Sequence, residues 1–310
     1  MIIIPVAKKF QQITILDKVT LTDNCLIELG TYSAKRVKVF KFDSQDQTEI
    51  QKRMTDSDCI LLSWRTPINK KLLATCPSLQ FIGLCATNSD CIDLIECSQR
   101  NIAVSNVRDY GDEGVVEWII HQLLSLVRGL GRYQWKDNPA EFSGKVIGII
   151  GLGVVGKLLA QAALGLKMKV LYYSRTRNRQ WEKRGIVFAK KEDLLVKSDF
   201  ISLQTPKDLK ILTTKDFALM KGKILINSTL GRAFARNDFI DWINKPNNYA
   251  IMDAAPDFAD EFSSLDRVIY SKFVSGLTKE AEIRLSQKTV QNVSSYLAGK
   301  PINVISGQIK

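Results

Sequence analysis

A glycine-rich hexapeptide, GLGVVG at 151–156, restricts the fold of this chain more than any other feature. It follows KVIGII, which has the composition of a buried strand, and it precedes the helix-compatible segment KLLAQAALGL. Between a strand and a helix, glycines spaced G-x-G-x-x-G permit a tight turn, a close approach of pyrophosphate to the backbone, and close helix–strand packing. The motif predicts a dinucleotide site whose pyrophosphate is contacted by Gly151, Gly153, Val154, Val155 and Gly156.

The segments around this motif alternate between strand-like and helix-compatible stretches. From Lys145 onward the strand candidates are KVIGIIG, KVLYYS, FISLQ, KILIN and YAIMDA, and near-continuous apolar runs of this kind are typical of buried parallel strands. A similar α/β rhythm, with DCILLSW at 58–64 and LQFIGLCA at 79–86, extends from Ile2 to about Asn106. Long helices are predicted at about 111–133 and 278–297. We therefore expect an α/β protein with two domains.

Composition excludes several other classes. The chain has 310 residues, 45% hydrophobic and 25% charged, as in globular proteins. The start MIIIPVAKK and the absence of any uncharged apolar run of 18 residues predict neither a signal peptide nor a membrane span, so we expect a cytoplasmic protein. The net charge of +12 is scattered without a basic run, and a basic surface plus a local phosphate site explain it without a nucleic-acid partner.

The cysteines do not form a metal-binding pattern. All six fall between Cys25 and Cys97, none belongs to a CxxC pair, and the chain has one histidine. We expect reduced, buried thiols and no metal site.

The end of the second predicted strand in the 145–284 region discriminates between the two dinucleotides. An NAD site usually places a carboxylate there to hold the ribose 2′-hydroxyl. Here KVLYYS ends at Ser174 and is followed by Arg175, Thr176 and Arg177, so two guanidiniums could clamp a 2′-phosphate. NADP(H) is therefore favoured over NAD(H); the alternative is that both arginines are solvated loop residues.

Several stretches together resemble the D-isomer-specific 2-hydroxyacid dehydrogenase family. They are ATNSDCIDL at 86–94, NIAVSNV followed by EGVVEW at 113–118, GLGVVG, INSTLG at 226–231, and SGLTKEAEIR at 275–284. The resemblance implies two Rossmann-like domains: a doubly wound dinucleotide-binding domain at 107–284, inserted in a flavodoxin-like split catalytic domain formed by 1–106 and 285–310. It also implies a small-molecule substrate, a homodimer paired through the 111–133 helix, and a nicotinamide side lined by Thr205, Pro206, Ser228, Thr229 and Asp253.

The catalytic positions that the resemblance implies are changed. Members of that family use an arginine that binds substrate, a histidine that acts as general acid and base, and a carboxylate that orients the histidine. Leu230, Phe273 and Phe258 stand at these three positions, with Asp257, Asp260 or Glu261 as other occupants of the third. Asn88 replaces a glycine that presents backbone N–H groups to the substrate. The usual 2-keto acid chemistry is therefore not expected.

Two hypotheses follow. The first is a reductase that transfers hydride to a C=C, C=N or bulky carbonyl substrate in an apolar cleft. Its candidate helpers are Arg65, Tyr110, His121, Arg232, Asp257 and Lys272. For His121, a packed, hydrogen-bonded histidine is favoured over a proton donor, and Arg65 is the best candidate for an anion contact. The second hypothesis is a non-catalytic dinucleotide-binding protein, a sensor or partner-binding subunit, that has kept the phosphate loop and lost turnover.

Overall fold

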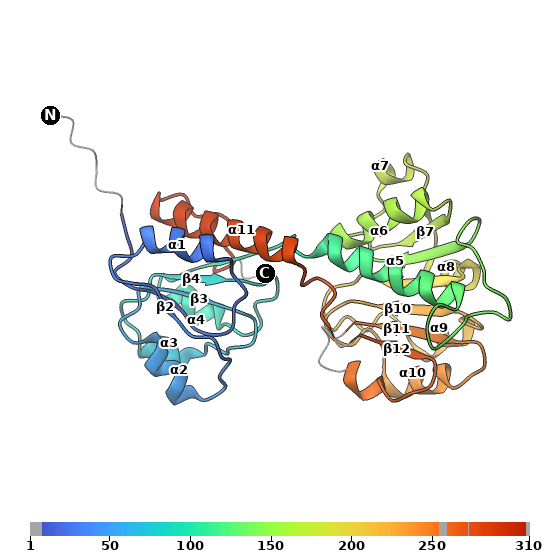
Figure 1. The fold of residues 1–310 in the computed structure, drawn as a ribbon, viewed down its shortest axis with the longest axis horizontal. Coiled ribbons are helices and arrows are strands. Elements are labelled where there is room, and N and C mark those ends of the chain that lie inside the picture. The colour runs from blue at the N-terminus through green and yellow to red at the C-terminus, as the bar shows by residue number, and fades with distance from the viewer. Residues whose placement is uncertain (1–7, 254–258, 272, 308–310) are drawn as a thin grey trace. The chain divides into compact units, whose positions relative to one another are not determined.

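The computed structural model describes residues 8–253, 259–271 and 273–307. The chain divides into two compact units, one formed by Met1–Tyr110 with Lys279–Lys310 and the other by Gly111–Thr278. These limits lie a few residues from those expected from the sequence. In each unit helices cover both faces of a parallel sheet, so the expected α/β class is confirmed (Figure 1).

The central unit, Gly111–Thr278, is built on a seven-stranded parallel sheet. Its strands are β6 (Val146–Ile150), β7 (Lys169–Tyr173), β8 (Val187–Phe188), β9 (Phe200–Leu203), β10 (Ile224–Asn227), β11 (Tyr249–Met252) and β12 (Val268–Tyr270). Their order is β12-β11-β10-β9-β6-β7-β8, which is doubly wound. The order reverses between β6 and β9, and ligands of such sheets bind beyond the carboxyl ends of the strands at that point. The GLGVVG loop begins there. The short edge strands β8 and β12 were not among the strands expected from the sequence.

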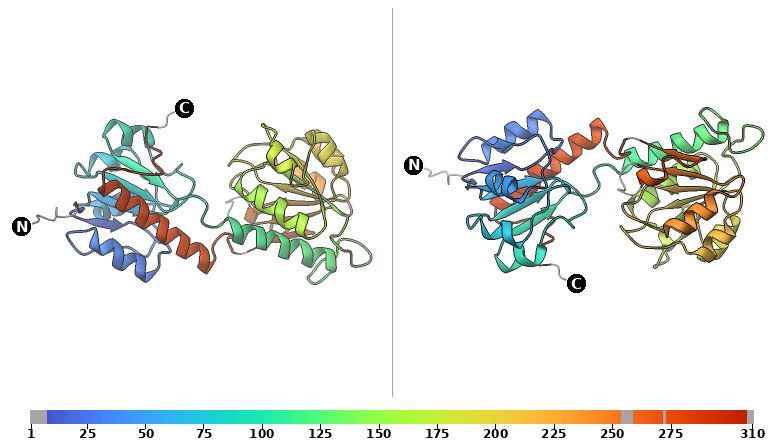
Figure 2. Two further views of the ribbon diagram at one scale, coloured as in Figure 1. Left: turned by 90° about the horizontal axis from the view of Figure 1, so that it is seen from above. Right: turned by 90° about the horizontal axis from the view of Figure 1, so that it is seen from below.

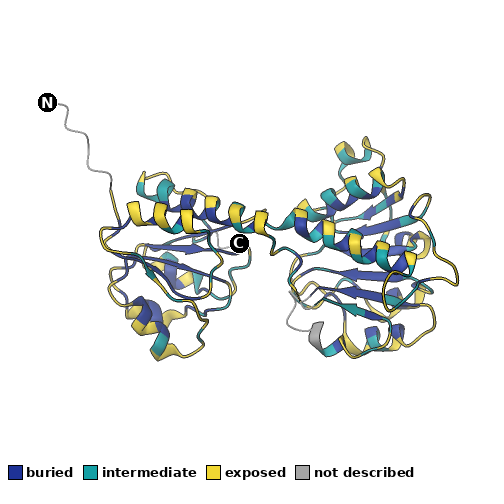
Figure 3. Cartoon of the chain, viewed as in Figure 1, coloured by how far each residue is buried: buried dark blue, intermediate teal, exposed yellow. Residues whose placement is uncertain are grey.

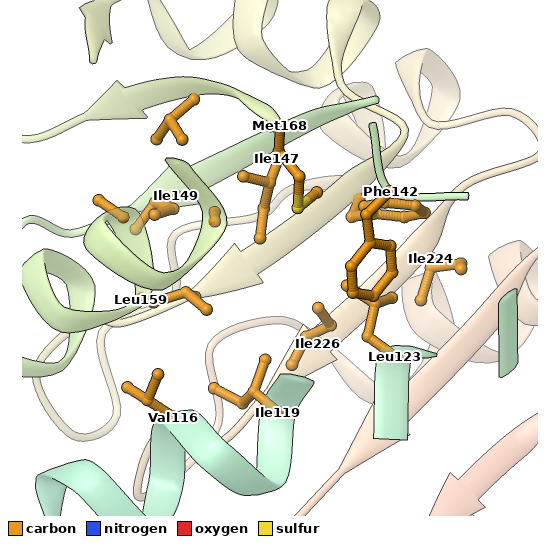
Figure 4. Close-up of a cluster of buried hydrophobic side chains, with 14 of the residues drawn as sticks. Val116, Ile119, Leu123, Phe142, Ile147, Ile149, Leu159, Met168, Ile224 and Ile226 are labelled. Carbon is orange, nitrogen blue, oxygen red and sulfur yellow. The ribbon is translucent and has the colours of Figure 1, made fainter. Parts of the chain in front are cut away.

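Alternate residues of these strands point to opposite layers of helices. The helices and the short η1 turn of this unit are α5 (Asp112–Arg128), α6 (Val154–Gly165), α7 (Arg179–Glu182), α8 (Lys191–Lys197), α9 (Thr214–Leu219), α10 (Arg236–Ile243) and η1 (Ala259–Phe262). In β10, Ile224 and Ile226 pack with α5 and α6 (Figure 4), whereas Leu225 packs with α8, α9 and α10. This alternation produces two separate apolar cores, one on each face of the sheet.

Helix α5 is shorter than the sequence predicted. The expected helix extended to residue 133, but α5 ends at Arg128 because Gly129 adopts a left-handed conformation with φ of 67°. The Gly129 N–H bonds back to the carbonyls of Leu126 and Ser125 and so satisfies the helix end. Apolar residues beyond the glycine had extended the helical pattern without continuing the helix.

The second unit has a five-stranded parallel sheet in the order β2-β1-β3-β4-β5. Its strands are β1 (Ile13–Ile15), β2 (Lys38–Val39), β3 (Cys59–Leu62), β4 (Phe81–Leu84) and β5 (Ala103–Asn106). Its helices are α1 (Asp23–Thr31), α2 (Gln47–Met54), α3 (Lys70–Ala74), α4 (Leu94–Gln99) and α11 (Lys279–Leu297). This is the flavodoxin-like order.

The C-terminal helix α11 completes the core of this second unit. It runs beside α1 and packs on β4 (Figure 2). Leu285, Val290 and Val293 of α11 share one core with Ile13 and Phe81 of the sheet. Both ends of the chain therefore contribute to the same domain.

Burial follows the sheets and the inward faces of the helices (Figure 3). The six cysteines are free thiols; five of them are buried and Cys91 is intermediate. Burial raises the pKa of the Cys85 thiol to about 12, so this side chain behaves as a small apolar group. Within 8–253, 259–271 and 273–307 there is neither a helix long and apolar enough to cross a membrane nor a cluster of potential metal ligands.

Candidate functional site: a nucleotide-binding loop at the carboxyl edge of the central sheet

The outer glycines of the GLGVVG loop are required by the backbone of the protein itself. Gly151 has φ of 103°, and a Cβ there would collide with the carbonyl oxygen of Gln204, which follows β9. A Cβ on Gly156 would collide with the carbonyl oxygen of Gly151. These two glycines let the loop turn sharply and let α6 pack closely on β6.

Gly153 differs from the other two glycines. It is the N-cap residue of α6 and has φ of −77°, which other residues also adopt. A Cβ at Gly153 would meet no atom of the described chain within 4 Å. No side chain of the described residues caps α6 at this end, so the first-turn N–H groups of Val154, Val155 and Gly156 have no side-chain partner there. This open cradle with a positive helix end fits the pyrophosphate of a dinucleotide.

The loop after β7 carries basic side chains and no carboxylate at its start. The Ser174 hydroxyl donates a hydrogen bond to the carbonyl of Thr176 at 2.5 Å and so tightens the turn. Arg175 is exposed and makes no hydrogen bond, ion pair or ring contact within the part of the chain that the structure describes. Its guanidinium is available to an anionic ligand.

Arg177 lies in the same loop but is already paired. Its Nε and Nη2 atoms donate to both carboxylate oxygens of Glu182 at 2.7 to 3.1 Å. Its guanidinium also lies 5.6 Å from the centre of the Phe188 ring. The hydrogen bonds from Arg177 and from the Tyr172 hydroxyl lower the pKa of Glu182 to about 2. The two arginines that the sequence presents as equivalent therefore stand in different environments.

Glu182 was not singled out from the sequence. Acidic residues are sought at the end of the second strand, whereas Glu182 stands at the end of α7, five residues after Arg177. An acidic residue on the short helix that follows an arginine-bearing loop is the only signal that could have found it.

Two buried polar atoms without partners lie at the carboxyl ends of the neighbouring strands β9 and β10. One is Oγ1 of Thr205 and the other is Nδ2 of Asn227, and neither has a hydrogen-bond partner among the described residues. Asn227 uses its other side-chain atom, Oδ1, to accept hydrogen bonds from the Thr229 amide and hydroxyl. Ser228 accepts a hydrogen bond at 3.0 Å from Gln204. Because buried polar groups are normally paired, the two orphaned atoms indicate a bound ligand or ordered water at this edge.

Asp253, which follows β11, is 1% exposed and holds the segment that leads to the end of the unit. Its carboxylate accepts hydrogen bonds from the amide and the hydroxyl of Ser275. Pro206 follows Thr205, and its carbonyl accepts a hydrogen bond from Leu209. Apart from Asp257, Phe258 and Lys272, which lie outside the described residues, and Asp260, whose side chain is not described, the structure places every candidate.

Two of the proposed helpers, Arg65 and Tyr110, make contacts within their own unit. Arg65 lies over the Trp64 ring and pairs with Asp43 at 3.7 Å. Tyr110 packs against an apolar core, and its carbonyl accepts a hydrogen bond from Arg284.

His121 is exposed on α5, so the expectation of a packed histidine is wrong. The core side of this helix carries Ile119 and Leu123, which are fully buried. His121 is two positions from each of them and therefore projects to the opposite side of the helix, because successive residues are rotated by about 100° around the helix axis. The apolar spacing that predicts this helix includes residues on both sides of His121, but it does not require His121 itself to be buried.

Arg232 and Glu261 belong to one charge cluster. Arg232 and Arg236 lie 3.1 Å from the two oxygens of the Glu261 carboxylate. The Arg232 amide also donates to Asp208. At the two described positions where the resemblance implies catalytic groups, Leu230 is 38% exposed and Phe273 is 81% exposed.

Comparison with known proteins identifies the family. The family model of the D-isomer specific 2-hydroxyacid dehydrogenase catalytic domain matches residues 13–306. The chain belongs to the D-isomer-specific 2-hydroxyacid dehydrogenase family. It is thus an oxidoreductase of this superfamily, whose cofactor is a nicotinamide dinucleotide, and the expected family and two-domain architecture are confirmed.

The relatives of this chain cover most of its length. A hydroxypyruvate reductase of Blautia hydrogenotrophica is 28% identical over 286 residues, covering 84% of this chain and 88% of that protein. A glyoxylate reductase of Thermococcus litoralis is 27% identical, and the match covers 83% of this chain and 86% of that protein. A solved acyclic imino acid reductase in complex with NADPH and D-Arg is 26% identical, with a TM-score of 0.80 over 95% of this chain and 99% of that chain.

Proposed function

We propose that this dehydrogenase-family chain is an NADP(H)-dependent reductase with a non-standard active site, whose acceptor is a C=N bond rather than the carbonyl of a 2-keto acid. Phe273 supports this proposal most directly. It is 81% exposed and stands where the family resemblance implies the acid–base histidine. Leu230 likewise stands where the substrate-binding arginine is implied. Neither side chain can donate a proton or bind a carboxylate.

A C=N acceptor suits a site without the histidine. A ketone accepts a hydride readily only if its oxygen is protonated in the same step, which is the task of a general acid. When bound, the reduced nicotinamide supplies the hydride. An iminium already carries its proton: its carbon would take the hydride, the C=N π pair would move to nitrogen, and an amine and the oxidised dinucleotide would be the products. Exposed apolar side chains such as Leu230 and Phe273 would serve to contact the substrate and exclude water.

The phosphate loop and Arg175 support the cofactor part of the proposal. Gly153 and the uncapped start of α6 fit a pyrophosphate. Ser174 stands where an NAD site usually has a carboxylate, and the free guanidinium of Arg175 would pair with a 2′-phosphate. The similarity to an imino acid reductase that was solved with NADPH supports both the cofactor and the acceptor.

A substrate screen tests the acceptor. The purified protein is incubated with NADPH and with glyoxylate or hydroxypyruvate, each with and without an amine that condenses to the imine, and with a conjugated enone. We expect NADPH oxidation only where an imine forms. Oxidation with the keto acids alone would contradict the proposal. Normal dinucleotide binding without turnover on any acceptor would favour the non-catalytic sensor or partner-binding subunit.

Calorimetry tests the cofactor. Titration with NADPH and NADH should show tighter binding of NADPH. Arg175→Ala should weaken NADPH binding by roughly 10- to 100-fold, the value of a charge-assisted contact, and leave NADH binding unchanged. Equal binding of the two dinucleotides by the unchanged protein would contradict the NADP(H) preference.

We also propose that the protein is a homodimer paired through α5. Leu124 of this helix is a large apolar side chain that is 40% exposed in the single chain. Multi-angle light scattering should give twice the chain mass of 34.9 kDa. Leu124→Glu should shift the mass toward that of one chain, because burial of a charge at the contact is unfavourable.

A further inference from the structure

The loop between β7 and α7 contains two arginines, of which Arg177 forms an ion pair and Arg175 forms none with the described residues. Arg177 uses Nε and Nη2 on Glu182, whose side chain is only 17% exposed. Arg175, two residues earlier, has no partner in the described parts of the chain. The sequence shows both as basic loop residues, so the difference arises from their contacts.

The pair between Arg177 and Glu182 is tied into the sheet. The buried Tyr172 of β7 donates its hydroxyl proton to Glu182 at 2.7 Å, and the same hydroxyl oxygen accepts the amide of Asn178 at 2.7 Å. The far end of the loop is thereby bound to a residue that is 0% exposed. Ser174 closes the near end with its hydrogen bond to Thr176. The loop is thus shaped before any ligand binds.

The two guanidiniums also differ in the electrostatic cost of binding a phosphate. If Arg177 turned to a phosphate, Glu182, whose side chain is mostly shielded from water, would lose its ion-pair partner Arg177, and the carboxylate would repel the phosphate. Arg175 gives up no partner when it binds an anion. The neutral Arg177–Glu182 pair leaves Arg175 as the unpaired charge between Ser174 and Asn178.

We infer that Glu182 is a positioning residue for cofactor specificity: it holds Arg177 as a brace of the 174–178 loop, so that Arg175 alone receives the 2′-phosphate. This inference rests on the proposed NADP(H) preference and adds a division of labour between the two arginines. It also assigns a role to Tyr172, whose hydroxyl joins the brace to the sheet.

The test uses two ligands that lack the nicotinamide, so that turnover plays no part. Calorimetry compares 2′,5′-ADP with 5′-ADP for the unchanged protein, Arg175→Ala, Arg177→Ala and Glu182→Gln. Arg175→Ala should weaken only 2′,5′-ADP, by roughly 10- to 100-fold. Arg177→Ala should weaken both ligands equally, by roughly 2- to 10-fold, because a loosened loop must be ordered on binding.

Glu182→Gln supplies the sharpest comparison. It removes the negative charge and the second acceptor oxygen that hold Arg177, while retaining an oxygen that can accept the Tyr172 proton. In this background Arg177 can replace Arg175, so Arg175→Ala should cost less 2′,5′-ADP affinity than it does in the unchanged protein. Circular dichroism and thermal unfolding confirm that each variant folds. The affected side chains of Arg177 and Arg175 are exposed, so folding should be retained.

Three results overturn the inference. A selective loss of affinity for 2′,5′-ADP in Arg177→Ala would show that Arg177 contacts the 2′-phosphate. An unchanged effect of Arg175→Ala in the Glu182→Gln background would show that Glu182 does not restrain Arg177. Equal binding of 2′,5′-ADP and 5′-ADP by the unchanged protein would overturn the NADP(H) preference together with the inference, and this outcome is recognised before any variant is measured.

Discussion

At the scale of single residues, each glycine of the phosphate loop has its own physical reason. Gly151 and Gly156 avoid collisions with carbonyl oxygens of the chain, whereas the space beside Gly153 is open. Glycine at 151 and 156 is needed for folding, whereas at 153 we propose that it is needed for the approach of a ligand. An alanine at 153 should therefore affect mainly ligand binding, whereas an alanine at 151 or 156 should affect mainly stability.

Gly153→Ala should change the free energy of unfolding by less than about 1 kcal/mol and weaken NADPH binding by roughly 10- to 100-fold. Gly156→Ala, the matched variant, should lower the free energy of unfolding by about 1–3 kcal/mol because its Cβ meets the Gly151 carbonyl. Urea unfolding and calorimetry measure the two quantities. Unaltered NADPH affinity in Gly153→Ala would show that no ligand approaches this backbone.

Glu182 should give the protein a measurable dependence of stability on acid. Hydrogen bonds from Arg177 and Tyr172 lower its pKa from 4.5 to about 2 in the folded state. A carboxylate with a lowered pKa stabilises the fold fully above its unfolded pKa, and the stabilisation is lost as the pH falls toward 2. The difference in urea stability between the unchanged protein and Glu182→Gln should thus be present at neutral pH and vanish over this window. A difference that is independent of pH would rule out the ion pair.

At the scale of elements, helix ends are decided by backbone conformation rather than by apolar pattern. The pattern that predicts a helix over 111–133 continues past Gly129, yet the left-handed glycine ends α5. Local hydrogen bonds from Gly129 replace those that the helix would have made. Apolar periodicity locates a helix well and its last turn poorly, because residues after the turn can also pack against the core.

Gly129→Ala should therefore lower the free energy of unfolding by about 1 kcal/mol, since alanine is strained at φ of 67°. Gly131 offers a control in the same loop, because its φ is not positive and a Cβ there meets no atom within 4 Å. Gly131→Ala should leave stability unchanged or raise it slightly. Equal losses in the two variants, measured by urea unfolding, would argue against the conformational explanation.

At the scale of the whole molecule, each unit has its own cores, and the residues proposed to contact the dinucleotide all belong to Gly111–Thr278. A ligand that binds one unit raises the stability of that unit by mass action. Helix α11 instead contributes Val293, which is 0% exposed, to the core of the other unit. The two units should therefore respond to different perturbations.

Val293→Ala should destabilise the unit that contains α11 by about 1–3 kcal/mol through the cavity that it leaves. NADPH should slow hydrogen exchange at 151–156 and 174–178 and should not restore the exchange rates around β4 in this variant. Hydrogen exchange with mass spectrometry resolves both segments. Recovery of β4 protection by NADPH would show that the two units are energetically coupled.

The sequence by itself determined the α/β class, the position of the phosphate loop and the family. These depend on local patterns: strand-length apolar runs, helical periodicity, and glycine spacing between a strand and a helix. It also located Ser174 and Arg175 correctly as residues of the loop after β7, because a parallel strand places its following residues at the carboxyl edge of the sheet.

Only the tertiary structure decided which groups are available for chemistry. Arg175 and Arg177 look alike in sequence, but the turn into α7 brings Glu182 to one of them and not to the other. His121 looks like a packed residue of an apolar helix, but the angle around α5 exposes it. The unpaired atoms of Thr205 and Asn227 are likewise visible only when neighbouring strands are aligned. Side-chain pairing and burial depend on distances between segments that are far apart in the chain or separated by a turn, and no local pattern encodes those distances.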